Sequence, residues 1–392
     1  MNRNWDYKKI GDICTVERGG SPRPIDDYIT DNPDGINWIK IGDTTDSMFI
    51  TSTAQKIIPE GAKKSRYVQP GDFLLSNSMS FGRPYILKID GCIHDGWLVL
   101  RDNKGLFDKR FLYYCLSAKP TYEKFKMMAV GGVVNNLNSE MVRKVEVPVP
   151  SITEQIEIAD LLDKANRIIE RRKQQLSALD DLIKARFVEM FGIPGTDAMG
   201  WGLTSLGECC ELNPKKSTDN RLVSGLEVSF VPMPAITENG AIDTSEIKTY
   251  DEVKTGFTYF SENDVLFAKI TPCMENGKGA VAVGLNNGIG FGSTEFHVLR
   301  PINGKSNPFW LYSLTSFDLF RKDAASNMTG SAGQRRVPAS FLERYKVSLP
   351  PIQLQNEFSS FAFQINKSKD AVKKSLDETQ VLFDSLMQQY FG

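Results

Sequence analysis

Two long stretches of the chain carry apolar residues at the spacing of a heptad repeat. In the first, from 152 to 191, these residues are Leu162, Ile169, Leu176, Ile183 and Met190. In the second, from 352 to 391, they are Ile365, Val372, Leu376, Phe383, Leu386 and Tyr390. A seven-residue repeat sustained over this length predicts a coiled coil or a long helix pair. The alternative is a surface helix packed on its own domain, but such helices usually run about 8–20 residues.

The ends of the first stretch carry helix-capping signals. Ser151 precedes it with Glu154 three residues later, which is the pattern of a capping box. Gly192 follows its last residue, and glycine is typical of a helix C-cap. A helix of this length spans about 55–60 Å at about 1.5 Å per residue.

The segments before both stretches have a different, strand-like pattern. Short apolar runs such as "WIKIGD", "GDFLL" and "WLVLR" alternate with turn signals such as "NPDG" and "ENGKG". A short helical run follows in each half, then a Gly-rich segment and a last strand that ends in "VPVPS" or "VSLPP". Each half therefore predicts a mixed α/β lobe followed by one long helix.

The two halves repeat each other at a period near 200 residues. "WDYKKIGDI" matches "WGLTSLGEC", Arg101 matches Arg300, and Tyr114 matches Tyr312. The repeat predicts lobes at 1–150 and 193–350 and helices at 151–192 and 351–392. The expected fold is α+β, with two lobes joined by two long antiparallel coiled-coil helices in a pseudo-two-fold dumb-bell.

Composition fits an ordinary globular protein, with 41% hydrophobic and 24% charged residues among 392. The start of the sequence lacks the apolar region of a signal peptide, and no run reaches the roughly 18 apolar residues of a membrane span. We therefore expect a cytoplasmic protein. The six cysteines form no C-x-x-C pair and only two histidines are present, so we expect buried free thiols and no metal site.

The charge balance argues against a protein that grips DNA unaided through a broad basic face. Net charge is −1; residues 1–150 carry 21 Lys and Arg against 18 Asp and Glu, and residues 193–350 carry 15 against 17. Enzyme motifs are incomplete as well. "NPFW" lacks the second Pro of an amino-methyltransferase loop, and "NGKS" lacks the first Gly of a P-loop. We expect no catalytic residue in this chain.

The loops differ between the halves although the framework repeats, which suits two identical partners and two different ligand surfaces. The phrases "ERGGSPRP", "QPGDFLLSNS", "VPVPSITEQIEIADLLD", "DDLIKARFVEMFG", "FAKITPCMENGKGAV" and "VSLPPIQLQ" carry a resemblance to a known family. Over essentially its whole length, the chain resembles the specificity (S) subunits of type I restriction–modification systems.

This resemblance implies a non-catalytic subunit whose lobes are target-recognition domains, each reading half of a bipartite DNA site. It also implies that the helices set the spacing and dock two methyltransferase (M) subunits, which carry S-adenosylmethionine, and that restriction (R) subunits join them. The alternative function is a scaffold whose lobes bind proteins. An enzyme with duplicated active sites needs matching polar residues in both halves, which the loops lack.

Base readout uses Arg, Lys, Asn, Gln and Ser side chains on loops that enter the major groove. In the first half the candidates are Arg18, Ser21, Arg23, Lys63, Lys64, Arg66, Asn77, Arg83, Asn135 and Asn136. In the second half they are Lys215, Lys216, Lys269, Lys278, Gln334, Arg335 and Arg336. Arg335 and Arg336 are the strongest pair, because they lie in a Gly/Ser-rich loop that corresponds to "GGVVNN" in the first half.

Overall fold

A computed structural model describes residues 5–77, 82–129, 136–331 and 333–392. The chain divides into two compact units. The first unit comprises Met1–Lys173 and Lys374–Gly392, and the second comprises Gln174–Lys373. Both divisions fall inside the long helices, so each unit contains half of each helix. We call the strands and short helices of each unit its lobe.

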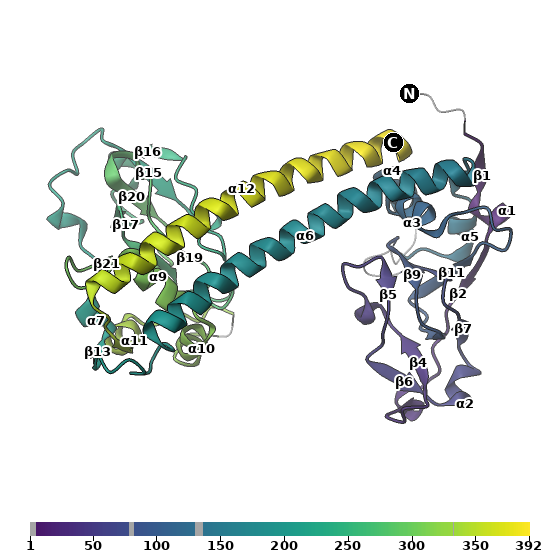
Figure 1. Cartoon of the computed structure of the whole chain (residues 1–392), viewed down its shortest axis with the longest axis horizontal. Coiled ribbons are helices and arrows are strands. Elements are labelled where there is room, and N and C mark those ends of the chain that lie inside the picture. The colour runs from purple at the N-terminus through teal and green to yellow at the C-terminus, as the bar shows by residue number, and fades with distance from the viewer. Residues whose placement is uncertain (1–4, 78–81, 130–135, 332) are drawn as a thin grey trace. The chain divides into compact units, whose positions relative to one another are not determined.

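The two long helices are α6 (Ile152–Phe191) and α12 (Ile352–Phe391), each of 40 residues (Figure 1). The predicted caps of α6 are present: the Ser151 hydroxyl accepts a hydrogen bond from the Glu154 N–H at 3.3 Å, and the Gly192 N–H donates to the Val188 carbonyl at 2.9 Å. Gly192 has a φ of 78°, in the left-handed region. Glycine adopts this conformation without steric cost.

The helices pair antiparallel within each unit. In the second unit the end of α6 meets the start of α12, where the Phe187 and Phe358 rings lie 5.4 Å apart. In the first unit the start of α6 and the end of α12 belong to one core: Ile158 and Leu162 are part of it, and Phe383 packs against it. Every residue of the predicted heptad positions is buried or half-buried.

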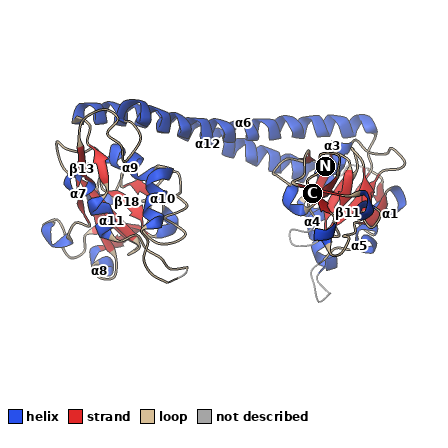
Figure 2. Cartoon of the chain, turned by 90° about the horizontal axis from the view of Figure 1, so that it is seen from below, coloured by secondary structure: helices blue, strands red, loops and turns tan. Residues whose placement is uncertain are grey.

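The first lobe consists of two main sheets and a short strand pair. Short helices lie around these strands (Figure 2). The strand orders are β2-β11-β8-β9-β5, β3-β6-β4-β10-β7 and β1-β12. The strands are β1 (Tyr7–Lys9), β2 (Thr15–Arg18), β3 (Ile29–Thr30), β4 (Ile36–Ile39), β5 (Phe49–Ile50), β6 (Gln55–Ile57), β7 (Arg66–Val68), β8 (Phe73–Ser76), β9 (Pro84–Leu87), β10 (Gly91–Ile93), β11 (Trp97–Arg101) and β12 (Glu146–Pro148). The short helices are α1 (Ile10–Ile13), α2 (Pro59–Ala62), α3 (Lys109–Ser117), α4 (Lys119–Ala129) and α5 (Ser139–Arg143).

The second lobe repeats this arrangement with the strand orders β14-β21-β18-β19, β16-β15-β20-β17 and β13-β22. Its strands are β13 (Leu203–Ser205), β14 (Cys210–Leu212), β15 (Glu227–Val231), β16 (Ile247–Thr249), β17 (Thr258–Ser261), β18 (Val265–Ala268), β19 (Gly279–Val281), β20 (Ile289–Gly292), β21 (Phe296–Pro301) and β22 (Lys346–Ser348). Its helices are α7 (Leu206–Cys209), α8 (Tyr250–Val253), α9 (Pro308–Ser316), α10 (Asp318–Ser326) and α11 (Ala339–Arg344).

The internal repeat predicted from the sequence is confirmed by this topology. The pairs β4–β10 and β15–β20 are the matching parallel pairs, and in both lobes the next strand of the chain, β11 or β21, crosses to the other main sheet. Arg101 pairs with Asp72 at 2.9 Å, and its counterpart Arg300 pairs with Asp264 at 2.7 Å. These framework ion pairs explain why both arginines appear at the same point of the repeat.

The match of Tyr114 with Tyr312 in the sequence repeat was wrong by one residue. Helices α3 and α9 both have nine residues and begin after the capping residues Asp108 and Asn307. Counted from these caps, Tyr312 corresponds to Tyr113, whereas Tyr114 corresponds to Ser313. The adjacent tyrosines of the first half made the sequence match ambiguous.

A buried glutamine near the start of each long helix fastens the helix to its lobe. Gln155 is 0% exposed; its amide donates to the Leu106 and Pro150 carbonyls, each at 2.9 Å, and its oxygen accepts from the Asp108 N–H at 2.9 Å. Gln355, also 0% exposed, makes the same three bonds at 2.8–2.9 Å. Its partners are Lys305, Pro350 and Asn307. The same amide therefore holds the N-terminal cap of α3 or α9 in each unit.

The cysteines are all unbridged, and every one except the half-exposed Cys273 is buried. Burial raises the pKa of Cys14 and of Cys115 to about 12, so both thiols stay protonated at neutral pH. Within the described ranges, no helix combines the length and apolarity needed to cross a membrane. Nor does any cluster of three or more His, Cys, Asp or Glu side chains there have an arrangement that could hold a metal ion.

Candidate nucleic-acid interface

In the first lobe, the predicted residues of the "RGGSPRP" loop gather around Asp95. Asp95 lies in the turn from His94 to Trp97 that joins β10 to β11, where the Trp97 N–H donates to the His94 carbonyl at 3.1 Å. The Ser21 hydroxyl donates to Asp95 Oδ1 at 2.9 Å, and Arg23 Nη2 donates to Oδ2 at 3.2 Å. Arg18 Nε donates to the Asp95 carbonyl oxygen at 3.0 Å. One acidic residue thus fixes a loop with two exposed arginines.

Asp95 keeps its charge in this position. Partial burial alone would raise the pKa of its carboxyl, but the hydrogen bonds from Ser21 and Arg23 and the nearby His94 and Arg18 outweigh burial, so the pKa lies below its ordinary value. The pKa of His94 is itself lowered, chiefly because burial disfavours its charged form.

The prediction for Asn77 was wrong. Its side chain was predicted to face DNA, but it is 2% exposed and its amide donates to the Asp95 carbonyl at 2.9 Å. The Asn77 carbonyl accepts from the Leu137 N–H at 2.9 Å, which brings the loop before α5 to the same place. Asn136, next to Leu137, is exposed, whereas Asn135 lies outside the described residues.

The other candidates of the first lobe lie on exposed or half-exposed positions with local partners. Arg66 pairs with Glu17 at 2.9 Å and donates from Nε to the Arg18 carbonyl at 3.4 Å, so it adjoins the Asp95 cluster. Lys64 Nζ donates to the Tyr28 hydroxyl at 2.5 Å. Lys63 and Arg83 are exposed.

The second lobe has an acidic residue in the equivalent turn. The Phe296 N–H donates to the Ser293 carbonyl at 3.3 Å, and Glu295 is the third residue of this turn between β20 and β21. Arg336 forms a bidentate pair with Glu295, with Nε–Oε2 at 2.9 Å and Nη2–Oε1 at 2.8 Å. Arg336 Nη1 donates to the Gln334 carbonyl at 3.1 Å. The hydrogen bonds from Arg336 hold the pKa of Glu295 below its usual value, so the pair is ionised at neutral pH.

The same three loops meet in both lobes. The Lys269 N–H donates to the Glu295 carbonyl, and the Lys269 carbonyl accepts from the Val337 N–H, both at 2.9 Å. Lys269 follows β18 as Asn77 follows β8, and Val337 precedes α11 as Leu137 precedes α5.

The Lys269 ammonium is half-buried, which lowers its pKa. Burial also lowers the pKa of the His297 ring, whose Nε2 bonds the Val337 carbonyl at 2.8 Å.

The remaining candidates of the second lobe are less closely gathered. Arg335 and Gln334 are exposed, and Arg335 Nη2 lies 3.9 Å from Glu275 Oε1. Lys278 Nζ donates to the Met233 carbonyl at 3.2 Å. Lys215 and Lys216 are exposed on the segment after β14, and the Lys216 ammonium donates to the Lys254 carbonyl.

Sequence reasoning missed the two acidic residues at the centres of these clusters. Base readout was sought among basic, amide and hydroxyl side chains, so Asp95 and Glu295 were not among the candidates. A signal was nevertheless present: in "HDGWLVL" and "STEFHVL" an acidic residue comes just before the matching apolar strands of the repeat.

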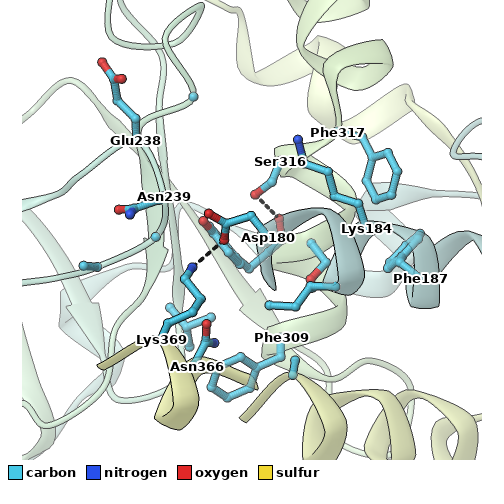
Figure 3. A pocket seen from close by; sticks show the side chains of 18 of the residues that line it. Asp180, Lys184, Phe187, Glu238, Asn239, Phe309, Ser316, Phe317, Asn366 and Lys369 are labelled. Atoms are coloured by element: carbon cyan, nitrogen blue, oxygen red, sulfur yellow. Dashed lines mark hydrogen bonds and ion pairs between the residues drawn. The ribbon is translucent and has the colours of Figure 1, made fainter. Parts of the chain in front are cut away.

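A second candidate site is a groove of about 990 Å³ in the second unit, between its lobe and the two long helices (Figure 3). Its wall includes Phe187 of α6 and Phe309 of α9, with the exposed Phe363 of α12, while the Asp180 and Lys369 side chains form an ion pair beside them. The groove thus combines an apolar lining with charged groups from both long helices.

At the corresponding place in the first unit, polar side chains link the lobe to α6. The Tyr114 hydroxyl donates to Asp163 Oδ1 at 2.6 Å, and its ring packs against Phe383 at 6.2 Å. Arg110 donates to Asp160 at 2.7 Å and to Asp163 at 2.8 Å. By position in the repeat, Ser313 replaces Tyr114 and Phe363 replaces Asp163 in the second unit. The two helix–lobe junctions are therefore different although their backbones repeat.

Comparison with known proteins supports this division into two repeats. The type I restriction modification DNA specificity domain matches the chain twice, at residues 2–179 and 199–379. The chain belongs to this family. Each match covers one lobe and most of the long helix that follows it, so the family domain is the repeating unit.

The Escherichia coli protein "Type I restriction enzyme EcoEI specificity subunit" is 40% identical over 195 residues, which are 48% of this chain and 32% of that protein. The match thus spans about a third of the length of this relative. Two solved structures share the fold over nearly the whole chain. The S subunit of the type I restriction–modification system from M. genitalium aligns with a TM-score of 0.54 at 15% identity, covering 100% of this chain and 97% of that one. A chain from a study of complex assembly in a type I R-M system aligns with a TM-score of 0.56 at 17% identity, covering 99% and 97%.

Proposed function

We propose that this chain is the non-catalytic specificity subunit of a type I restriction–modification complex and that each lobe reads one half of a split, asymmetric DNA site. The observation that supports this most strongly is the pair of equivalent loop clusters around Asp95 and Glu295. Each cluster is built on the same framework turn, yet each presents different basic and polar side chains. A repeated frame with different loops suits duplex DNA, whose backbone repeats while its base edges differ.

The long helices act as the spacer and as the docking surface for two methyltransferase subunits, and restriction subunits join the complex through them. S-adenosylmethionine belongs to the methyltransferase partners, which transfer its methyl group to adenine. The repeated frame of the two units fits this function, because two copies of one partner can then dock on equivalent positions of the long helices. One of the structurally similar chains comes from work on the assembly of a type I R-M system, which agrees with a multisubunit context.

The net charge of −1 fits a subunit that reads bases while its partners bind most phosphates. Affinity for DNA is dominated by phosphate contacts, whereas base contacts supply specificity. In both clusters basic side chains are already paired with acids, which reduces their non-specific attraction to DNA. Specific binding therefore depends on the assembled complex.

A second candidate function is a protein-binding scaffold, which the apolar groove of the second unit favours. Phe363 is 59% exposed at this groove. An exposed aromatic side chain beside a large apolar cavity is typical of a protein interface. This function predicts partner binding that is independent of DNA sequence.

Reconstitution with the methyltransferase subunit separates the two functions. The purified complex is incubated with radiolabelled S-adenosylmethionine and a library of DNA duplexes, with each subunit alone as a control. Transfer of label to a defined subset of duplexes, only when this chain is present, supports the specificity function. Equal labelling of all duplexes, or labelling that does not depend on this chain, contradicts it and leaves the scaffold function.

A further inference from the structure

We propose that Asp95 and Glu295, at neighbouring positions of the same turn, are positioning residues that aim arginines at DNA bases and that Arg336 reads a guanine in the half-site of the second lobe. The proposal rests on the proposed DNA-reading function and adds which side chains set its specificity. No acidic residue was among the candidates from the sequence.

The proposal depends first on the geometry of Arg336. A guanidinium has five N–H donors in a fixed plane. Glu295 accepts from Nε and from one hydrogen of Nη2, and the Gln334 carbonyl accepts one hydrogen of Nη1. With respect to the described residues, one donor therefore remains on each of Nη1 and Nη2. We infer that these two donors bind the O6 and N7 acceptors of guanine, which arginine contacts with two N–H groups in the major groove.

The Arg336 side chain is both exposed and held. It is 42% exposed, while the bidentate carboxylate of Glu295 fixes the plane of the guanidinium. A preorganised side chain loses less conformational entropy on binding than a mobile one. The adjacent Arg335 has no such anchor: its nearest described acidic oxygen is 3.9 Å away. We therefore assign base readout to Arg336 and phosphate contact to Arg335.

The first lobe uses the same turn in a different way. Asp95 is the second residue of its turn and Glu295 is the third, so the carboxylates start from neighbouring points of one framework. The Asp95 carboxylate accepts one hydrogen bond from Arg23, whose side chain is 80% exposed, and another from Ser21. Among the described residues Arg23 has only this bond, so it has more freedom than Arg336. A shift of the acidic residue by one position gives each lobe its own arrangement of arginine donors.

The test is adenine-methylation mapping in a methylation-free host that expresses the chain with its methyltransferase subunit. Four variants are compared with the wild type: Glu295→Gln, Asp95→Asn, Arg336→Lys and the control Glu246→Gln. The control removes an exposed carboxylate that pairs with Lys248 on β16 at 3.3 Å, away from the long helices and from both loop clusters. Purified variants are melted in parallel to verify that they remain folded.

We expect Glu295→Gln and Arg336→Lys to relax the same guanine position in one half-site by roughly tenfold or more, because a bidentate contact discriminates by about 1–3 kcal/mol. Asp95→Asn should relax the opposite half-site only, and Glu246→Gln should leave the motif unchanged. The proposal is overturned if folded Glu295→Gln or Arg336→Lys protein keeps the wild-type motif, or if either relaxes both half-sites. A wild-type chain that yields no split motif refutes the proposed function itself, which is a different result.

Discussion

Replacement of the buried glutamines tests how the long helices are fastened to their lobes. Gln155→Met keeps the length and shape of the side chain but removes three hydrogen bonds of 2.9 Å. The Asp108 N–H and the carbonyls of Leu106 and Pro150 then lose their partner. Leaving a buried polar group unsatisfied costs about 1–3 kcal/mol. Since the loop of Leu106 and Asp108 is partly exposed and water can reach it, we take the lower end for each group and expect a loss of about 3 kcal/mol.

The effect should be confined to one unit. Gln355→Met removes the equivalent bonds in the second unit, so each variant should increase amide hydrogen exchange at the start of α3 or of α9 but not at both. Gln174→Met, at an exposed position of α6, is the matched control. It should change stability by no more than about 0.5 kcal/mol, as is usual for surface substitutions.

Exchange is followed by mass spectrometry, and urea unfolding gives the free-energy change. A loss below about 1 kcal/mol, or faster exchange at both helix starts in one variant, would refute the reasoning.

Three further predictions concern pH, packing and DNA binding. The Glu295–Arg336 pair should stabilise the second lobe at neutral pH and lose this effect as pH falls below about 4, because the pKa of Glu295 is lowered from the ordinary value of about 4.3. The urea midpoints of wild type and Glu295→Gln should therefore differ at neutral pH and converge in acid. A difference that stays constant with pH would be inconsistent with this ionisation. Tyr114→Ser should lower the free energy of unfolding of the first unit by about 3–5 kcal/mol, since it removes a packed ring and the hydrogen bond to Asp163. Ser313→Tyr should lower that of the second unit by less than about 1 kcal/mol, because the groove has room for the ring. Equal losses of stability on thermal melting would contradict the described difference between the junctions. The chain without its partners should bind DNA weakly and lose binding as salt rises. Nanomolar sequence-specific binding in fluorescence anisotropy at physiological salt would disprove the proposal that the methyltransferase subunits make most of the phosphate contacts.

The long helices and the repeat were predictable because periodic patterns report directly on the backbone. Heptad spacing, the Ser151 cap and the Gly192 C-cap are local signals, and they agree with the helix that runs from Ile152 to Phe191. The expectation of a repeated α/β lobe before each helix is likewise confirmed by the matching strand orders. These signals depend on residues close together in the sequence.

The composition of the loop clusters depends on contacts between distant residues, and sequence reasoning did not reach it. Asn77 comes directly after an apolar strand, a position that predicts an exposed loop residue. Its amide is nevertheless buried against the Asp95 carbonyl. Arg335 and Arg336 are neighbours with the same charge, but Arg336 alone meets Glu295 in a bidentate pair. Ser313 lines the groove of the second unit, and its partner in the repeat is clear only from the three-dimensional structure.

The most direct test of a two-lobe reader of DNA is the genomic methylation pattern produced by the wild-type chain. A methylation-free host expresses the chain with its methyltransferase subunit, and N6-methyladenine is mapped over the whole genome. We expect one split, asymmetric motif, with two defined half-sites separated by a spacer of fixed length. A continuous motif, or no motif from a methyltransferase that is active with another specificity chain, would contradict a reader with one lobe for each half-site.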